Sequence, residues 1–267
     1  MSGPALEAFL ETAHLLADAA GEMARDHWFG GGAAGFKPCG TALTEADTRI
    51  ETRLREMIEA RHPDHGILCE EFGAKAVERD FVWVIDPIDG TRQFAAGLMN
   101  FGVLIALCQE ERPVLGIIDQ PLARARYAAA EGHGATLNGK VITAGATRAL
   151  SQATLAIANP ASFPEDMREG AESLAEAARM TVYDGGCLAY GALARGQVDL
   201  CLNGPDLNPH DICALVPVVT QAGGTITDWE NRPLTLASEG AILAAATPAL
   251  HAQALDRLTR HDPVWIP

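Results

Sequence analysis

Basic residues are scarce in this sequence. Its 267 residues include 20 Lys and Arg against 35 Asp and Glu, which gives a formal net charge of −15 at pH 7 and a pI near 4.9. A chain this acidic is not expected to bind nucleic acid or an anionic membrane through a basic face. If its substrate is an anion, something other than the side chains must supply positive charge.

The sequence also lacks long hydrophobic runs and paired cysteine motifs. No run approaches the roughly 20 apolar residues of a membrane-spanning helix. The first ten residues have no basic segment and include Glu7, so we expect no secretory signal. Six cysteines are scattered without a C-x-x-C pair, which argues against a structural zinc site and predicts reduced, mostly buried thiols in a cytoplasmic protein. The apolar content of 48% is too high for a disordered chain.

No Pro/Ser-rich linker and no internal repeat divides the chain. Apolar residues at helical spacing predict helices over 6–28 and 44–60, the second with Thr44 as N-cap and Asp47 in a capping box. The glycine run at 30–32 ends the first helix, and the residues that follow, up to 40, are expected to form a mobile loop.

Strands are predicted in the middle of the chain. The apolar run 81–85 stops at Asp86-Pro87, and the runs 101–108 and 114–118 are separated by polar residues typical of a hairpin. After about residue 145 strands and helices alternate, which indicates an α/β second half. The expected strands there are 155–158, 180–183, 198–202, 225–227 and 241–246, and the expected helices are 165–179, 188–194, 211–221 and 248–260. Pro217 should kink the third of these helices.

The most informative segment comes at the end of the first predicted strand. Asp86 and Asp89 are three residues apart. Pro87 pushes Asp86 toward extended geometry, and Gly90 permits a tight turn, so both carboxylates can converge on one point. Hard oxygen ligands of this kind suit Mg²⁺, and the N–H groups of Gly90 and Thr91, if they begin a helix, face an anion such as phosphate. Asp-Pro and Asp-Gly are also common turn formers, but turn chemistry alone requires neither Thr91 nor the second Asp.

Two further acidic features carry less information when taken singly. Glu70-Glu71 follows a short apolar stretch, and such a pair is usually a solvated surface feature. Asp211 opens an apolar helix, where an acidic side chain stabilises the helix dipole by roughly 0.3–1 kcal/mol. Their order along the chain, one before and one after the 86–91 segment, makes both features more informative.

Glu70-Glu71, then Asp86-Pro87-Ile88-Asp89-Gly90-Thr91, then Asp211 followed by Ala222-Gly223-Gly224 resemble the motifs of the inositol monophosphatase superfamily of Mg²⁺-dependent phosphate monoester hydrolases. The resemblance covers nearly the whole chain. It implies a layered αβαβα fold, in which an α+β unit at 1–145 carries the first two motifs and an α/β unit at 146–267 carries the third. The active site should lie between the two units. The resemblance also implies a homodimer and inhibition by Li⁺.

The same resemblance implies a set of metal ligands. Glu70, Asp86 and the carbonyl of Ile88 would hold the first ion, and Asp86, Asp89 and Asp211 would hold the second. With a third, weaker ion near Glu70, two to three Mg²⁺ are implied per site. These ions would supply the positive charge that the acidic chain lacks, because clustered carboxylates repel one another unless they bind cations.

The resemblance also implies catalytic and substrate-binding residues. Thr91, hydrogen-bonded to Asp47, would help polarise the attacking water together with Glu70, and the reaction would need no phosphoenzyme. Lys37 matches a loop lysine that approaches the site in some relatives. The implied substrate contacts are Asp86, Gly90, Thr91, Arg92, Gly186, Asn203 and Asp211.

Within the superfamily, the segments 89–94, 116–121 and 207–217 look most like histidinol-phosphate phosphatases. His210 stands where inositol monophosphatases usually place Trp. The histidinol-phosphate branch tends to place acids near the amine of its substrate, but at those positions this sequence has 185–187 (Gly-Gly-Cys) and Asn203. The nearest acids that could replace them are Asp184 and Asp206.

The same residues bear on four other functions. An inositol or other polyol monophosphate is the alternative substrate. A nucleotide 3′-phosphatase would need a basic or aromatic nucleotide pocket, and a fructose bisphosphatase would need a basic cluster for a second phosphate; the sequence offers neither. A metal-binding scaffold without activity would be expected to have lost a motif residue, yet every motif position is filled.

Overall fold

The computed structural model describes residues 3–31, 34–36 and 42–259. Both predicted N-terminal helices are present, as α1 (Gly3–Gly30) and α2 (Glu45–Arg61). Between them, β1 (Ala34–Phe36) pairs antiparallel with β2 (Ala42–Thr44), where a loop was predicted. Lys37 and the rest of that predicted loop lie outside the described residues.

The first half of the chain builds an eight-stranded sheet on which the acidic motifs lie. The strand order is β10-β9-β8-β7-β6-β5-β3-β4, antiparallel except where β3 and β5 run parallel. Its strands are β3 (Gly66–Cys69), β4 (Gly73–Lys75), β5 (Phe81–Asp89), β6 (Gly102–Gln109), β7 (Arg112–Gln120), β8 (Ala125–Ala130), β9 (Gly134–Leu137) and β10 (Lys140–Ile142). Helix α3 (Thr91–Ala95) follows β5 directly. Trp83, Ile85 and Ile105 are fully buried in this sheet.

The second half builds a five-stranded mixed sheet with the order β12-β11-β13-β15-β14. Its strands are β11 (Thr154–Ile157), β12 (Met180–Tyr183), β13 (Leu200–Asn203), β14 (Thr225–Asp228) and β15 (Ile242–Ala245). Its helices are α4 (Glu165–Ala177), α5 (Gly186–Ala194), α6 (Pro209–Ile212), α7 (Leu215–Gln221) and α8 (Pro248–Thr259), with short 3₁₀ turns at Leu150–Gln152 and Pro160–Ser162.

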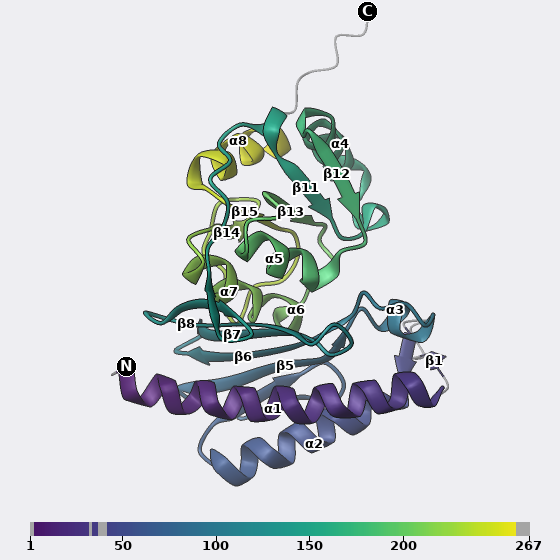
Figure 1. Cartoon of the computed structure of the whole chain (residues 1–267), viewed down its shortest axis with the longest axis vertical. Coiled ribbons are helices and arrows are strands. Elements are labelled where there is room, and N and C mark those ends of the chain that lie inside the picture. Colours follow the sequence, from purple (N-terminus) through teal and green to yellow (C-terminus); the bar gives the residue numbers. More distant parts are fainter. Residues whose placement is uncertain (1–2, 32–33, 37–41, 260–267) are drawn as a thin grey trace, which may run out of the picture.

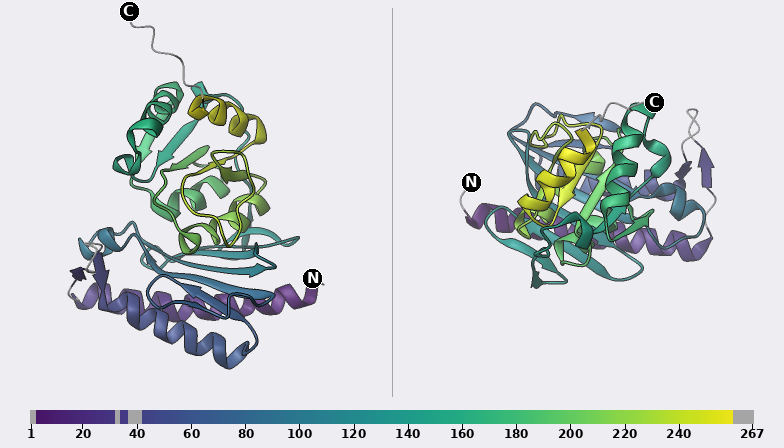
Figure 2. Two further views of the ribbon diagram at one scale, coloured as in Figure 1. Left: turned by 180° about the vertical axis from the view of Figure 1, so that it is seen from behind. Right: turned by 90° about the horizontal axis from the view of Figure 1, so that it is seen from above.

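The elements stack in five layers (Figures 1 and 2). Helices α1 and α2 cover one face of the large sheet, and α5, α6 and α7 separate its other face from the small sheet. Helices α4 and α8 close the far side of the small sheet. This arrangement confirms the αβαβα fold. The large sheet lies within 66–142 and the small one within 154–245, while one apolar core joins them; the division at 145/146 stays a prediction.

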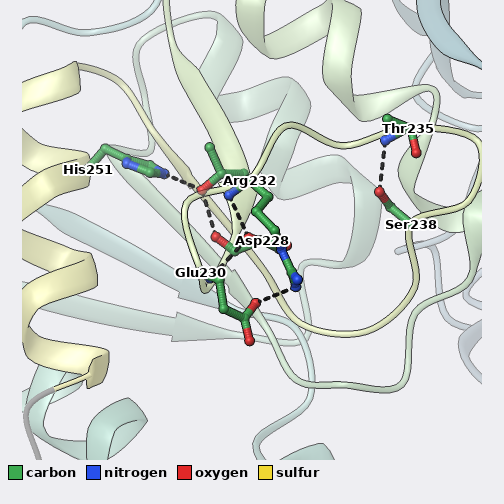
Figure 3. Close-up of polar contacts among 7 residues, drawn as sticks. Asp228, Glu230, Arg232, Thr235, Ser238 and His251 are labelled. Atoms are coloured by element: carbon green, nitrogen blue, oxygen red, sulfur yellow. Dashed lines mark hydrogen bonds and ion pairs between the residues drawn. The ribbon is translucent and has the colours of Figure 1, made fainter.

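Side-chain contacts stabilise the edge strand β14 of the small sheet and the turn that follows it (Figure 3). The hydroxyl of Thr227 lies 3.0 Å from Nε2 of His251 on α8. After the strand, Asp228 accepts hydrogen bonds from the backbone N–H groups of Glu230 and Arg232 and pairs with the Arg232 guanidinium. These contacts close the turn that follows β14. Among the described residues, no helix combines the length and the apolar character needed to cross a membrane.

Two predicted elements end differently from the expectation. Strand β5 does not stop at Asp86 but continues through Asp89, with an irregularity in its pairing to β6. The helix predicted over 211–221 is two short helices, because α6 ends at Ile212 and α7 begins at Leu215. Pro217 therefore lies in the first turn of α7, where its missing N–H costs no hydrogen bond, and the break precedes it.

Candidate active site

Three carboxylates from two distant parts of the chain meet at one point. Asp86, Asp89 and Asp211 each place an oxygen so that all three oxygens lie within 4.8 Å of one another. Asp86 is buried, and the other two are partly buried. The first two come from β5 and the third from α6. The convergence of Asp86 and Asp89 predicted from their spacing is therefore realised, and Asp211, which the family resemblance groups with them, lies at the same point.

An irregularity in β5 turns its two carboxylates to the same side. In a regular strand, residues three apart point to opposite faces of the sheet. Here Asp86 pairs with Leu104 of β6 and Asp89 with Gly102, so three steps along β5 match two steps along β6. A bulge of this kind shifts the alternation by one residue. Within it, the backbone N–H of Ile88 donates to Oδ1 of Asp86 at 2.9 Å, which fixes that carboxylate.

Asp211 is held in place by a capping box at the start of α6. Its Oδ2 accepts a hydrogen bond from the backbone N–H of Asn208 at 2.7 Å, and the Asn208 side chain reciprocates. Nε2 of His210 lies 3.6 Å from the same oxygen. The role predicted for Asp211 by its position in the helix and the one implied by the resemblance are therefore compatible, because one carboxylate oxygen caps the helix and the other is free to face the cluster.

Asp89 is held by the start of α5. Its Oδ2 accepts a hydrogen bond from the backbone N–H of Cys187 at 3.0 Å. The preceding Gly186 has φ of +48°, and a Cβ there would lie 3.1 Å from the same oxygen. Glycine at this position therefore lets the helix start approach the carboxylate closely. This gives Gly186 a packing reason besides the substrate contact that the resemblance implies.

The cluster is electrostatically strained without a cation. Burial, followed by the charges of Glu70 and Asp211, raises the pKa of Asp86 well above its usual range. Burial also raises the pKa of Asp89, although the hydrogen bond from Cys187 opposes the shift. Burial and the charge of Asp89 raise the pKa of Asp211 to about 8. A crowded, buried set of oxygen donors with excess negative charge fits a hard divalent cation such as Mg²⁺.

Glu70 and Asp47 lie beside this cluster rather than within it. Glu70 lines the same cavity, and its charge raises the pKa of each of the three cluster aspartates. Asp47 on α2 is fully buried, and its charge also raises the pKa of Asp86. The side chain of Thr44, the predicted N-cap of α2, lies outside the described part of the structure.

Glu51 on α2 positions the segment that carries Glu70. It is fully buried, and its carboxylate accepts hydrogen bonds from the backbone N–H groups of Glu71 at 2.8 Å and Phe72 at 2.9 Å. Arg55 pairs with Glu51 at 2.9 Å and also donates to the carbonyl of Gly73. Glu51 is not among the site residues predicted from the sequence. Its only signal is a charged residue on the apolar side of α2, one position after Ile50.

The cluster opens into a cavity of about 280 Å³ that residues of both halves line. On the first-half side, the hydroxyl of Thr91 donates to the carbonyl of Ile88 at 3.0 Å, and the hydrogen bond between Thr91 and Asp47 that the resemblance implies stays a prediction. Gly90 has φ of +89° at the start of α3, as its predicted turn requires. Arg92 is exposed at the cavity rim.

On the second-half side, two candidate specificity residues are already engaged. The Oδ1 of Asn203 accepts a hydrogen bond from the buried hydroxyl of Tyr190 at 2.6 Å, so this oxygen has a partner inside the protein. Asp184, with φ of +63°, accepts hydrogen bonds from the side-chain amides of Gln93 and Asn100. Asp206 also lines the cavity and is exposed. Tyr190, Gln93 and Asn100 were not recognised in the sequence, because each acts through a partner that is remote along the chain.

The chain is similar over almost its full length to known phosphatases. The inositol monophosphatase family model matches residues 5–262. The chain is 37% identical to the chloroplastic bifunctional phosphatase IMPL2 of Arabidopsis thaliana over 98% of this chain and 78% of the relative, and 32% identical to the histidinol-phosphatase of Chlorobaculum parvum over 88% and 91%. An inositol monophosphatase structure from Zymomonas mobilis superposes with a TM-score of 0.85 at 34% identity, covering 97% and 99%.

The fold, the carboxylate cluster and the relatives all indicate the same class of protein. The chain is a phosphatase that hydrolyses phosphate monoesters. Members of the class use metal ions, and the acidic cluster is the place in the described structure where such ions fit. More narrowly, the chain belongs to the inositol monophosphatase family. The resemblance predicted from the three sequence motifs is thereby confirmed.

Proposed function

We propose that the protein is a Mg²⁺-dependent phosphate monoester hydrolase whose site holds two to three ions. Glu70, Asp86 and the carbonyl of Ile88 would bind one ion, and Asp86, Asp89 and Asp211 a second. The observation that carries this proposal is the meeting of three carboxylate oxygens within 4.8 Å. When bound, the ions would supply a nucleophilic hydroxide and neutralise charge on the phosphate and the leaving oxygen.

The chain's own residues would position the reactants around those ions. Glu70 and Asp47 border the cluster and would orient the attacking water. Thr91 sits beside the Ile88 carbonyl and would hold that ligand in place through its hydroxyl. The N–H groups of Gly90 and Thr91 would donate hydrogen bonds to the phosphate oxygens at the start of α3. Direct attack by water on phosphorus would release phosphate and the alcohol without a phosphoenzyme.

The test of this function is phosphate release from small monoesters by the purified protein. We expect activity with Mg²⁺, loss of activity after removal of divalent cations, and recovery when Mg²⁺ is restored. Li⁺ should inhibit by competing at the Asp89/Asp211 side of the cluster. Activity that persists without divalent cations would contradict the proposal.

For the substrate we propose histidinol phosphate, which would place the protein in histidine biosynthesis. Asp184 and Asp206 both lie on the cavity rim and offer carboxylates to the substrate ammonium. Asp184 is already fixed by two amides, whereas Asp206 has no such side-chain partner among the described residues. A charge-assisted bond to an ammonium is roughly twice as strong as a neutral one. An inositol monophosphate lacks the ammonium and is the alternative, supported by the Zymomonas mobilis relative.

The two substrates are separated by comparing wild type with Asp206→Asn. We expect wild type to prefer histidinol phosphate over inositol 1-phosphate and a nucleotide 3′-phosphate. The variant should raise KM for histidinol phosphate about tenfold and leave inositol 1-phosphate nearly unchanged, because only the former carries the ammonium. Asp166→Asn, at an exposed position of α4, serves as the matched control. Equal effects on both substrates would favour the polyol alternative.

We also propose a homodimer in the cytoplasm. Met180, Val182 and Tyr183 are exposed along the edge strand β12. Leu98 and Met99 are exposed on the adjoining loop, which Asn100 ties to Asp184 beside the end of that strand. An exposed apolar edge of this kind is typical of an interface. Light scattering should give twice the chain mass for wild type and the chain mass for Tyr183→Glu.

A further inference from the structure

A second cavity, of about 410 Å³, lies between α1 and the turns that follow β7 and β9. None of its lining residues lines the cavity above the carboxylate cluster. Its charged residues are Asp18, Arg25, Asp119, Arg124 and Arg126, and we call it the arginine pocket. In a chain with a net charge of −15, a cavity with three guanidinium groups is a local reversal of charge.

The inner wall of the arginine pocket is a fixed ion-pair network. Nε of Arg126 lies 2.7 Å from Oδ1 of Asp119, and Nη1 of Arg126 lies 2.9 Å from Oδ1 of Asp18. The side chain of Asp119 is 7% exposed and that of Arg126 is 20% exposed. Arg126 also donates to the backbone carbonyl of His14 on α1. The wall is therefore already ordered and would lose little side-chain entropy when a ligand binds.

The other two guanidinium groups are not neutralised in the same way. Arg25 donates to the backbone carbonyl of Pro121 at 3.5 Å, a long contact with an uncharged group. Arg124 is exposed and has no side-chain hydrogen bond or ion pair with any residue that the structure describes. Three arginines thus face two carboxylates, which leaves an excess of one positive charge at the cavity.

The backbone holds Arg124 at the mouth of the pocket in a conformation that L residues rarely adopt. Its φ is +51°, and the left-handed region costs a non-glycine residue roughly 1–2 kcal/mol. Asn138, in the turn between β9 and β10, stabilises this geometry. Its Nδ2 donates to the carbonyl of Arg124 at 2.9 Å, and its Oδ1 accepts from the N–H of Arg126 at 2.9 Å. Asn138 therefore links the turn after β9 to the turn after β7 that carries Arg124.

We propose that the arginine pocket binds a small organic anion, with its phosphate or carboxylate group held by Arg25 and Arg124. Guanidinium groups match the planar carboxylate and the phosphate with paired N–H donors. The cavity volume lies within the range of small-molecule sites and exceeds what a bare inorganic ion fills. The site does not depend on the carboxylate cluster or on bound metal, so it is separable from catalysis.

Calorimetric titration of the metal-free protein, dialysed free of chelator, tests the site. Pyrophosphate and citrate are the two probes, because they distinguish a phosphate from a carboxylate preference, and ionic strength is fixed near 0.15 M. We expect saturable binding of at least one probe at one site per chain. The double variant Arg25→Gln/Arg124→Gln should weaken it at least tenfold. Arg112→Gln, which removes an exposed arginine paired with Glu131 elsewhere, should leave it unchanged.

Asp211→Asn separates the arginine pocket from the catalytic cavity. Probe binding that survives this substitution and is lost in the double variant supports the proposal. Binding that survives the double variant unchanged, or that is lost with Asp211→Asn, would place the anion at the carboxylate cluster and overturn it. Absence of saturable binding with both probes would overturn it as well. Unchanged circular dichroism of the double variant shows that lost binding is not lost folding.

Discussion

Asp86 and Asp211 share one cation-binding cluster but differ in what else they do. Asp86 fixes the bulge of β5 by accepting the Ile88 N–H, and Asp211 caps α6 by accepting the Asn208 N–H. An amide oxygen can accept either hydrogen bond, whereas it cannot replace the negative charge. Substitution by Asn at these positions therefore separates folding from cation binding.

We predict that Asp86→Asn and Asp211→Asn each reduce phosphate release by at least about a thousandfold, because each removes a ligand charge from the cluster. In the metal-free protein at pH 8, Asp211→Asn should raise the unfolding temperature, since it relieves repulsion among buried carboxylates; about 1 kcal/mol corresponds to roughly 2–4 °C at this size. Mg²⁺ should stabilise wild type more than the variant. Wild-type turnover in either variant would refute the ligand assignment.

His65 provides a pH-dependent contribution to stability away from the site. Its Nδ1 accepts a hydrogen bond from the indole N–H of the fully buried Trp83 at 3.1 Å, so this nitrogen must be unprotonated. Burial and the neighbouring His62 lower the pKa of His65 from 6.5 to about 4. Because the folded-state pKa is depressed, the neutral ring stabilises the fold above pH 6.5, and this contribution is lost as pH falls from 6.5 toward 4.

We predict that the unfolding temperature of wild type falls by several degrees between pH 6.5 and 4.5, more steeply than that of His65→Asn. The asparagine oxygen keeps an acceptor near the indole but does not titrate in this range. His133→Asn, at an exposed turn, is the control and should keep the wild-type slope. Parallel curves for wild type and His65→Asn would show that His65 is not the titrating group. Differential scanning calorimetry at matched ionic strength makes the comparison.

At the scale of elements, the sequence predicted which segments carry the site but not how they are joined. Alternation and helical spacing are local signals, so the helices over 3–30 and 45–61 and the strand from residue 81 were found. The extension of β5 to Asp89 was missed because Pro87 is usually a strand breaker, whereas the bulge against β6 accommodates it. The interruption between α6 and α7 agrees with the kink predicted from Pro217, which has no N–H to donate to the carbonyl four residues earlier, but the sequence did not predict that the helix would divide at 212–215.

Hydrogen bonds to Glu51 join α2 to the turn between β3 and β4, and this contact can be tested by substitution. Glu51 fixes the backbone of Glu71 and Phe72, and so positions the neighbouring Glu70. Glu51→Gln leaves the backbone N–H groups of Glu71 and Phe72 with one acceptor in place of two carboxylate oxygens, which costs about 1 kcal/mol. We expect a lower kcat with a smaller change in KM, and a higher Mg²⁺ concentration for half-maximal activity, measured by phosphate release at varied Mg²⁺.

Glu56→Gln, about one and a half turns further along α2 on an exposed face, is the matched control for Glu51→Gln. It should leave kcat, KM and the Mg²⁺ concentration for half-maximal activity unchanged. If Glu51→Gln lowers stability without changing the Mg²⁺ dependence, the residue is structural only. A buried acidic residue in an otherwise apolar helix face could have indicated such a role, but its hydrogen-bond partners lie 20 and 21 residues away and belong to a turn that periodicity does not predict.

At the scale of the whole molecule, the resemblance predicted more than the residue patterns did. Hydrophobic patterns indicated an α/β second half but not the pairing order β12-β11-β13-β15-β14 or the parallel pairing of β3 with β5. Pairing order depends on contacts between residues remote along the chain, such as the pairing of Leu155 on β11 with Leu200 on β13. The convergence of Asp211 with Asp86 and Asp89 was implied by the family motifs alone, because 122 residues separate Asp89 from Asp211 along the chain.

The net charge of the molecule should affect the rate at which the site captures a charged substrate. At low salt the Debye length is about 30 Å, so an approaching phosphate dianion is repelled by carboxylates across a protein with a net charge of −15. At about 0.15 M salt the length falls to about 8 Å, and the substrate then interacts mainly with the site itself. Screening therefore removes distant repulsion while sparing the short contacts with bound Mg²⁺.

With Mg²⁺ saturating, kcat/KM for inositol 1-phosphate should consequently rise several-fold when KCl is increased from about 0.01 to 0.15 M, because the Debye length shrinks over that interval. For histidinol phosphate, whose ammonium offsets part of the phosphate charge, the rise should be smaller. Each substrate gives a slope of kcat/KM against salt concentration. The ratio of the two slopes measures how strongly the net charge of each substrate interacts with the electrostatic field of the protein, independently of any contact with Asp206. A monotonic fall of kcat/KM with salt for both substrates would mean that attraction by the metal site, and not repulsion by the acidic surface, governs capture.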